Sequence, residues 1–506
     1  MEVLRTKTVE QSLADTDDPE RGLRRALGPV QLTLLGIGVI IGTGIFVLTG
    51  EAAGTVAGPA IAISFAVAAV VCLLAGLCYA EFASVVPVAG SAYTFSYASL
   101  GELIAWIIGW DLILELALGA ATVASGWSQY LQVVLTGAPW HANPPAWIFA
   151  DHHNLMAAFI VLVLSGLLCL GVRTSSAFNG VIVAIKLAII LLVIIAGLSY
   201  VHSGNFHPFI PPTGTHPAPG GSSGTTLIQD LGAAPGAFGI GGIFSGAALV
   251  FFAFIGFDIV ATNAEETRKP QRDVPIGIFA SLAICAVLYV AVSLVVTGMV
   301  KFNHVNVKAP LSTAFLSVHQ NTLATIVGYG ALAGITSVVL VLLMGQSRVF
   351  FAMSRDGLLP PVFSAVSKRF GTPYRTTLFT GLAVALMTFL FPLKTLAELV
   401  NIGTLFAFVL VAIGVIVLRR TRPDLDRPFR TPLVPVLPIA SVLASLWLML
   451  NLQSTTWLRF GVWLLVGLVF YFTYSYRRSR LARGEEPPPP SRPAQEARTR
   501  ERVGVG

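Results

Sequence analysis

Long apolar runs recur along the whole chain, separated by short segments that hold most of its charged residues and prolines. A run of roughly 18 or more apolar residues can cross a bilayer core of about 30 Å as a helix. The pattern predicts twelve spans, near 30–49, 57–80, 102–134, 154–172, 178–200, 237–261, 275–299, 326–351, 377–392, 396–418, 433–451 and 458–476. Backbone groups in lipid must bond within their own segment, so the expected class is an all-α polytopic membrane protein.

The composition favours a membrane protein over two or three soluble domains. Of the 506 residues, 55% are hydrophobic and 11% are charged, and the mean hydropathy is +0.78. Soluble domains carry about 25% charged residues. The first 29 residues are polar and charged. We therefore expect no cleavable signal peptide, and the first span would direct insertion.

The net charge is +7, and the basic residues are distributed along the chain in a way that reflects membrane topology rather than nucleic-acid binding. Lys and Arg concentrate in alternate connections, on the side of the N-terminus, and the opposite side carries Lys301, Lys308, Lys394 and Arg459. Cytoplasmic loops carry such an excess of basic residues. We expect a protein embedded in the lipid bilayer of a bacterial plasma membrane, with both termini on the cytoplasmic side. The sequence indicates no nucleic-acid partner and identifies no protein partner.

Residues that usually form metal or catalytic centres are scattered along the sequence. The four cysteines lie inside apolar spans, and the eight histidines fall in loops. Neither a spacing typical of zinc ligands nor a nucleophile beside a base is apparent in the sequence. The expectation is therefore no metal, no cofactor and no enzymatic activity, and a channel filter motif is also missing from the sequence.

The centre of the first span is unusually rich in glycine. Glycine weakens a helix interior by roughly 1 kcal/mol relative to alanine. For Gly36 and Gly38, close helix packing and local unwinding both remain open. Gly42, Thr43 and Gly44 are expected to interrupt the helix. The N–H groups at the start of the following half-helix would then favour an anion such as a carboxylate, in a cavity lined by protein.

The sixth span has a similar feature. Gly256 and Asp258 fall near its middle, and Asp258 could contact substrate or cap a half-helix. Interrupted segments at corresponding positions of two halves are typical of transporter binding sites. Because the interruptions are five spans apart, we predict two five-helix repeats, 30–200 and 237–418. Five is odd, so the repeats would be inverted.

The other segments have less chemistry. We predict a cytoplasmic N-terminal segment at 1–29, an extracellular loop at 201–236, helices 11 and 12 within 419–476, and a disordered cytoplasmic tail at 477–506. Between spans two and three, 81–100 predicts a short amphipathic helix at the cytoplasmic surface. The mixed-charge runs 265–270 and 354–360 suit either solvated loops or a charge gate.

Three ionisable residues lie inside spans three and five. A charge at the bilayer centre costs about 2.5–3.5 kcal/mol on insertion scales, so such a residue indicates function. Lys186 lies deep in span five, where apolar neighbours on both sides argue against snorkelling. Asp111 and Glu115 share one face of span three. Asp111 is expected at the interface, and for Glu115 a role as proton acceptor and a structural hydrogen bond both remain open.

Three separated motifs resemble a known family in order and spacing. They are 36–46, then 252–258 with Glu265 and Glu266, and then 348–360. They resemble the amino acid–polyamine–organocation permeases, and within them the bacterial branch of the cationic amino acid transporters, over about residues 20–476. The resemblance implies the inverted five-plus-five fold of LeuT-type transporters with two additional C-terminal helices.

The resemblance also implies a substrate site built from backbone atoms of the two interruptions. The substrate carboxylate would meet N–H groups of Thr43 and Gly44, beside Gly42. The α-amine would meet the carbonyls of Ile40, Phe252 and Ile255.

Coupling and selectivity are implied in the same way. Lys186 matches the position where sodium-coupled relatives hold an ion, which implies proton coupling, and Glu115 matches an acidic position of this branch. Leu342 and Leu343 would give the side-chain pocket an apolar wall. The resulting hypothesis is proton-coupled uptake of an L-amino acid by alternating access, with alanine favoured over arginine or lysine. A non-transporting amino acid sensor would share these features.

Overall fold

The computed structural model describes residues 27–85, 91–137, 140–150, 152–171, 176–218, 225–232, 236–364 and 372–483. Within these ranges the regular structure is helical, apart from the isolated bridges Leu27–Thr267 and Thr226–Gln453. The predicted all-α class is confirmed. Most of the predicted N-terminal segment and most of the predicted tail lie outside the described residues.

Eight helical stretches in the described ranges are long and apolar enough to cross a membrane. They are Gly44–Val85, Glu102–Thr136, Asn179–Leu198, Gly239–Ala261, Pro270–Met299, Asn321–Arg355, Leu393–Thr421 and Ser454–Arg478. Pro29–Ile40, Leu155–Cys169, Tyr374–Leu390 and Val436–Leu450 are shorter apolar helices. The first long stretch joins the second half of predicted span one to span two. The fold is therefore polytopic, and the number of twelve spans stays a prediction.

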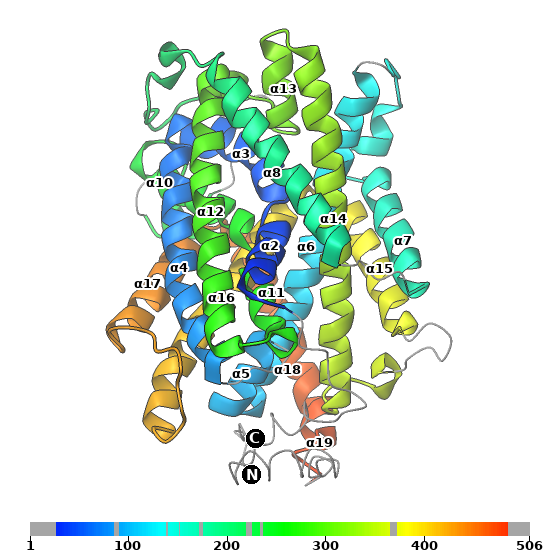
Figure 1. The fold of residues 1–506 in the computed structure, drawn as a ribbon, viewed down its shortest axis with the longest axis vertical. Coiled ribbons are helices and arrows are strands. Elements are labelled where there is room, and N and C mark those ends of the chain that lie inside the picture. The colour runs from blue at the N-terminus through cyan, green and yellow to red at the C-terminus, as the bar shows by residue number, and fades with distance from the viewer. Residues whose placement is uncertain are drawn as a thin grey trace.

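Two short half-helices and the segments that continue them occupy the centre of the bundle (Figure 1). The first interrupted element is α2 (Pro29–Ile40), followed by a π-helical turn (Gly44–Leu48), α3 (Thr49–Ala52) and a second such turn (Ala53–Ala57). The second is α10 (Gly239–Val250), followed by a 3₁₀ turn (Phe251–Phe254) and α11 (Phe257–Thr262). Both lie where span one and span six were predicted.

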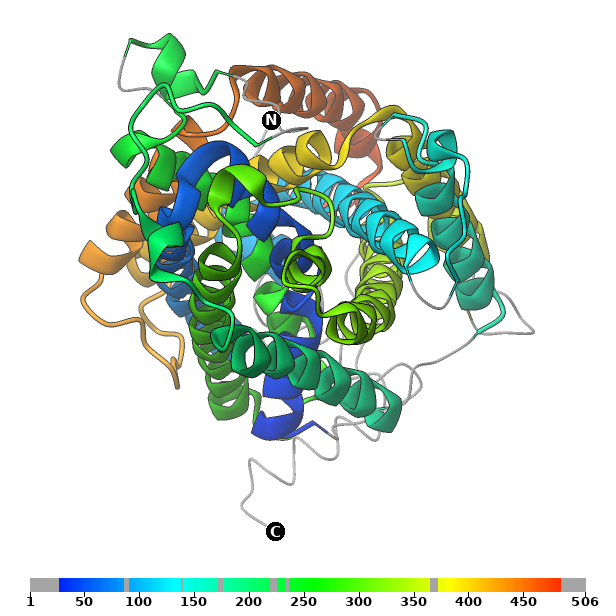
Figure 2. The same ribbon diagram turned by 90° about the horizontal axis from the view of Figure 1, so that it is seen from above.

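Longer helices surround this centre, namely α4 (Ile61–Val85), α6 (Glu102–Thr136), α8 (Ser176–Leu198), α12 (Pro270–Met299), α14 (Asn321–Arg355) and α16 (Leu393–Thr421). In Figure 1, α8 crosses obliquely in front of α2. Seen from above, α7 (Leu155–Cys169) and α15 (Tyr374–Leu390) lie on one flank, and α17 (Val436–Leu450) and α18 (Ser454–Phe470) lie at the periphery elsewhere (Figure 2). The short helices are α5 (Ser91–Ser99), α9 (Leu227–Asp230), α13 (Pro310–Ser317) and α19 (Tyr476–Arg478).

Burial separates the central helices from those that face outwards. In the most apolar window of Gly239–Ala261, 83% of the residues are buried, against 22% for Ser454–Arg478. A segment that is apolar on all sides needs no lipid when other helices enclose it. The interrupted elements are therefore shielded by protein, as their free backbone groups require.

The predicted short helix between spans two and three exists as α5, but its predicted amphipathic surface position is wrong. All of the side chains from Ala92 to Tyr97 are buried. The ring of Phe95 stacks on that of Phe82 in α4 at a centroid distance of 5.3 Å. The aromatic residues of α5 thus pack against the ends of longer helices, which explains why this connection is so apolar.

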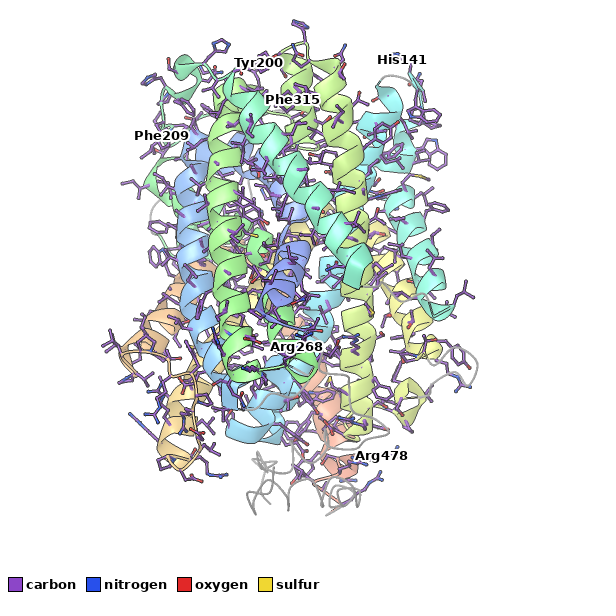
Figure 3. The ribbon with its side chains drawn as sticks, in the orientation of Figure 1. His141, Tyr200, Phe209, Arg268, Phe315 and Arg478 are labelled. Atoms are coloured by element: carbon purple, nitrogen blue, oxygen red, sulfur yellow. The ribbon has the colours of Figure 1, made fainter. Side chains whose placement is uncertain are left out.

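Residues predicted on opposite sides of the membrane lie at opposite ends of the bundle. Figure 3 places Arg268 and Arg478 at one end and His141, Tyr200 and Phe209 at the other. The separation agrees with the alternation of basic connections in the sequence. Which end faces the cytoplasm stays a prediction.

Candidate substrate site

The first interruption begins directly after α2. The last backbone bond of this helix runs from the N–H of Ile41 to the carbonyl of Ile37 (2.9 Å), and Ile41 itself is extended, with ψ 96°. Helical structure resumes at Gly44. The interruption predicted at Gly42, Thr43 and Gly44 is therefore present, displaced by one residue towards the N-terminus.

Gly36 and Gly38 lie inside the continuous helix α2, so the packing interpretation holds for both. A Cβ on Gly36 would lie 2.6 Å from Oγ of Ser281 in α12. A Cβ on Gly38 would lie 2.7 Å from Cγ2 of Val183 in α8. These two glycines let α2 approach both neighbouring helices.

The second interruption follows the 3₁₀ turn at the end of α10. Ile255 is extended, with φ −62° and ψ 137°, and its N–H donates to the carbonyl of Phe252 (3.2 Å). Gly256 has φ +116°, a conformation that costs little only for glycine. The predicted interruption at Gly256 is therefore present as well.

The two interruptions touch each other. A Cβ on Gly44 would overlap the backbone of Ala253, and a Cβ on Gly256 would lie 2.5 Å from Cγ1 of Val39. The hydroxyl of Tyr289 in α12 lies 2.8 Å from the carbonyl oxygen of Ile40 and 3.1 Å from that of Ala253. Tyr289 therefore joins the two interrupted elements at their closest approach.

Lys186 reaches the same end of α2 from α8. Its ammonium Nζ donates to the carbonyl of Gly38 at 2.6 Å, and its side chain is fully buried. The stem passes over Gly334 of α14, where a Cβ would lie 3.0 Å from Cγ of the lysine. The last carbonyls of a helix have no partner within it, and its C-terminus favours a cation. Lys186 and Tyr289 supply donors to this end of α2.

Thr43 and Gly42 of the first interruption lie against α6 and α14. The hydroxyl of Thr43 donates to the carbonyl of Val123 in α6 (3.2 Å), and its methyl group lies over Gly126. A Cβ on Gly42 would lie 3.3 Å from Cγ2 of Val338 in α14. The hydroxyl of Thr43 is therefore bonded to α6, and the role of the backbone N–H groups of Thr43 and Gly44 stays a prediction.

Three carboxylates are buried in the bundle, Asp111 and Glu115 of α6 and Asp258 of α11. Glu115 is 3% exposed, bonds to the hydroxyl of Thr404 in α16, and lies within electrostatic range of Asp111 and Asp258. Asp258 accepts N–H groups of the backbone at the start of α11, as its capping interpretation required. The predicted interfacial position of Asp111 is wrong.

Asp111 is fully buried inside the bundle. It packs against Gly403 of α16, where a Cβ would lie 2.5 Å from its Oδ1. Its carboxylate oxygens have no hydrogen-bond partner among the described residues. Position near the end of a span suggested the interface, but the close approach of α16, permitted by glycine, covers the side chain.

The predicted apolar wall lies at the contact of α6 and α14. Leu342 is 5% exposed, and its Cδ1 would lie 3.6 Å from a Cβ on Gly119. In the same way Leu116 faces Gly345 at 3.6 Å. Each helix thus inserts a leucine above a glycine of the other.

The described charged residues of the two mixed-charge runs differ in burial: Arg268, Lys269 and Arg355 are exposed, and Asp356 is buried. Asp356 is 7% exposed; its Oδ2 accepts the hydroxyl of Tyr93 (2.7 Å) and its backbone carbonyl accepts the N–H of Arg480 (3.1 Å). The solvated-loop interpretation is therefore wrong for Asp356. The side chain of Glu265 lies outside the described residues.

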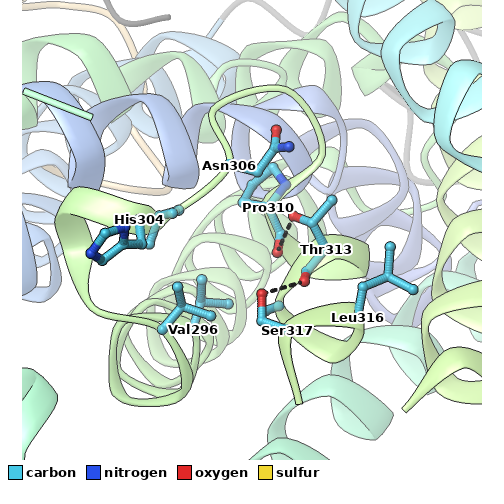
Figure 4. A pocket seen from close by; sticks show the side chains of 10 residues that line it. Val296, His304, Asn306, Pro310, Thr313, Leu316 and Ser317 are labelled. Carbon is cyan, nitrogen blue, oxygen red and sulfur yellow. Dashed lines mark hydrogen bonds between the residues drawn. The ribbon is translucent and has the colours of Figure 1, made fainter. Parts of the chain in front are cut away.

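A surface pocket lies away from both interruptions. It has a volume of about 360 Å³ and lies between the end of α12 and α13, with His304, Asn306 and Thr313 among its lining residues (Figure 4). The hydroxyls of Thr313 and Ser317 donate to backbone carbonyls of α13. None of the lining residues belongs to an interruption, so this surface pocket is a poor candidate for the transport site.

The sequence is similar to those of known transporters over most of its length. Residues 27–471 match the family model described as amino acid permease. A branched-chain amino acid permease of Bacillus subtilis is 48% identical over 95% of this chain and 99% of its own length. A methylthioribose transporter of the same organism is 46% identical over 91% and 95%. A vacuolar cationic amino acid transporter of Arabidopsis thaliana is 39% identical over 79% of this chain and 61% of its own length.

Proposed function

This chain belongs to the amino acid permease family, and we propose that it is a secondary active transporter that takes up L-amino acids with protons by alternating access. The family and the relatives are named as permeases or transporters and not as enzymes, which agrees with this proposal. The observation that carries the proposal is the contact of the two interruptions, joined by Tyr289, inside a shell of helices.

The substrate's backbone would bind between the interruptions. The N–H groups of Thr43 and Gly44 begin the second half of span one, where a helix N-terminus attracts a carboxylate. The carbonyls of Ile40, Phe252 and Ile255 end the opposing segments and would accept the α-amine. The first two already accept bonds from Tyr289 and from the N–H of Ile255, and a carbonyl oxygen has a second lone pair for the amine.

Proton coupling would act through Lys186. As an ammonium it has three donors and a charge that the C-terminal end of α2 favours, and one donor holds Gly38. Loss of the proton removes the charge and weakens this hold, so α2 could then move relative to α8. Glu115, among the buried acids, would be a second proton-binding group.

The side chain of the substrate would be neutral and apolar. Of the two leucines predicted for the pocket wall, Leu342 and Leu343, the first packs against Gly119, and Leu116 of the facing helix packs against Gly345. Alanine is the first candidate, and the name of the relative with 48% identity adds branched-chain amino acids to the test. Arginine and lysine are second, supported by the name of the Arabidopsis relative.

The proposed topology has twelve spans, with both termini in the cytoplasm and inverted repeats at 30–200 and 237–418. The equal lengths of the half-helices support it: α2 and α10 each have 12 residues and each ends at an interruption. Contact between the two interrupted elements also supports it, since transporters with inverted repeats bind substrate where the repeats meet.

Counterflow in proteoliposomes tests the proposal. Vesicles loaded with one unlabelled compound are diluted into the same labelled compound, across all proteinogenic amino acids and methylthioribose. Labelled uptake with at least one amino acid is expected, followed by accumulation under an imposed inward proton gradient. An amino acid sensor would bind but give no counterflow. Accumulation that does not depend on the proton gradient would contradict proton coupling but not amino acid transport.

A further inference from the structure

Asn401 makes a contact at the second interrupted element that the sequence did not suggest. It lies in α16, fully buried, and its Nδ2 donates to the carbonyl of Ala248 at 2.8 Å and to that of Leu249 at 3.1 Å. These carbonyls belong to the last turn of α10, where a helix has no partners of its own. Its Oδ1 has no partner within the described ranges. Both hydrogen bonds of this side chain within the described ranges therefore go to α10.

This contact repeats that of Lys186 at the first interrupted element. Gly38, held by Lys186, is the tenth residue of α2, and Ala248, held by Asn401, is the tenth residue of α10. Each donor comes from the last helix of its predicted repeat, α8 within 30–200 and α16 within 237–418. The correspondence thus covers the acceptor, its position in the half-helix and the helix of the donor.

We propose that Asn401 is the counterpart of Lys186 in the second repeat, a positioning residue that holds α10 against α16 throughout transport. The inference rests on the proposed function. An amide cannot lose a proton at physiological pH, so its two bonds persist whatever the proton concentration. The bond from Lys186 to α2 is strengthened by the charge of the ammonium group and weakens when that charge is lost. Coupling is therefore confined to one of the two interrupted elements, and the other keeps the substrate carbonyls of Phe252 and Ile255 in place.

The role of Asn401 can be measured by replacing its amide donor with a carboxyl group, which donates a hydrogen bond only while it is protonated. Asn401→Asp keeps the shape of the side chain. As a neutral acid it has one O–H to donate to α10, and as a carboxylate it can only accept and faces two carbonyl oxygens. Asn401→Leu has a similar volume and no donor at any pH.

Ionisable side chains on α16 and on other elements can also make wild-type transport depend on pH. The same helix contributes Lys394 and Glu398, and neighbouring elements contribute Glu51, Asp111, Glu115, Asp258, Arg459 and the phenol of Tyr79. The informative quantity is therefore the ratio of variant to wild-type counterflow at each pH, with equal pH on both sides of the membrane.

We expect this ratio for Asn401→Asp to fall about tenfold between pH 5 and pH 8, because a buried carbonyl is left without its donor as the acid ionises. The fall should appear as a rise in KM, since the displaced end of α10 continues directly into the turn that holds the proposed substrate carbonyl of Phe252. Asn401→Leu should be impaired about tenfold at every pH. Recovery of the aspartate variant at low pH shows that it is folded.

Asn205 offers a matched control. Its Nδ2 donates to the carbonyl of Gly298 in the last turn of α12, an uninterrupted helix (2.7 Å). Asn205→Asp should follow the wild-type pH profile. A flat ratio for Asn401→Asp, or wild-type counterflow in Asn401→Leu, overturns the inference while the proposed function stands. Absence of wild-type counterflow with every compound overturns both.

Discussion

The two interrupted elements look alike in the sequence, but their glycines serve different physical needs. At the first, Thr43 has φ −54°, and Gly42 and Gly44 are not among the residues with positive φ. Glycine is needed there for room, since Gly44 meets the backbone of Ala253. At the second, Gly256 has φ +116° and needs glycine for its conformation as well as for room beside Val39.

The ends of the preceding half-helices differ in the same way. α2 is held by a lysine and a tyrosine, and α10 by an asparagine. A charged donor can respond to protons, whereas an amide cannot. The first element is therefore the one suited to move with proton binding, and the second the one suited to remain fixed. The following predictions separate the two elements.

Gly44→Ala should have the largest effect and abolish counterflow. The new Cβ would overlap main-chain atoms of Ala253, which cannot be relieved by rotating a side chain. Initial rates of counterflow measure the loss. Gly166→Ala is the control, because a Cβ there meets nothing within 4 Å, and it should transport as the wild type does. Activity in Gly44→Ala above a tenth of wild type would show that the interruptions separate more than the structure indicates.

Lys186→Ala should abolish accumulation driven by a proton gradient while leaving counterflow measurable. The variant loses the protonable donor to Gly38 but keeps Tyr289 and the backbone of both interruptions. Uptake with and without the gradient, at one substrate concentration, checks this. Lys301→Ala, an exposed lysine after α12, is the control and should accumulate normally. Accumulation by Lys186→Ala equal to wild type would remove the lysine from the coupling mechanism.

Gly256→Ala should reduce transport about tenfold to hundredfold. A side chain at this φ costs of order 1–3 kcal/mol in backbone strain. The contact with Val39 adds to it, and that part can be removed separately. The double variant Gly256→Ala with Val39→Ala should recover only part of the rate, because the strain in the backbone remains. Complete recovery would mean that room alone explains this glycine, as at Gly44.

The sequence was sufficient for the features that depend on local chemistry. Glycines and a lysine inside apolar spans are conspicuous, so both interruptions and Lys186 were predicted. Tyr289 and Asn401 were missed, because one polar residue in an apolar span is common and their carbonyl partners lie 249 and 153 residues away in the chain. Asp111 was misplaced for a related reason, since its burial depends on Gly403 of a distant helix.

Tyr289→Phe should have the smallest effect of the series, a decrease of about twofold to tenfold in counterflow. The ring stays packed against Phe65 and Phe254, so the loss is restricted to the hydroxyl and its bonds. A hydrogen bond of this kind contributes about 0.5–1.5 kcal/mol. The hydroxyl has one hydrogen to share between Ile40 and Ala253, and an α-amine bound at Ile40 could replace it there.

The variant therefore also shows whether the hydroxyl of Tyr289 donates to the carbonyl of Ile40 only while no substrate amine is bound there. If it does, Tyr289→Phe should lower thermal stability without substrate and regain most of it at saturating substrate, because the amine then satisfies the carbonyl of Ile40. Tyr130→Phe is the matched control, since its hydroxyl donates to the carbonyl of Phe46 within the second half of span one (2.8 Å). Its loss of stability should persist at saturating substrate. Equal recovery by both variants would indicate that the ligand stabilises the whole protein. It would contradict the idea that the hydroxyl of Tyr289 occupies the position of the substrate amine.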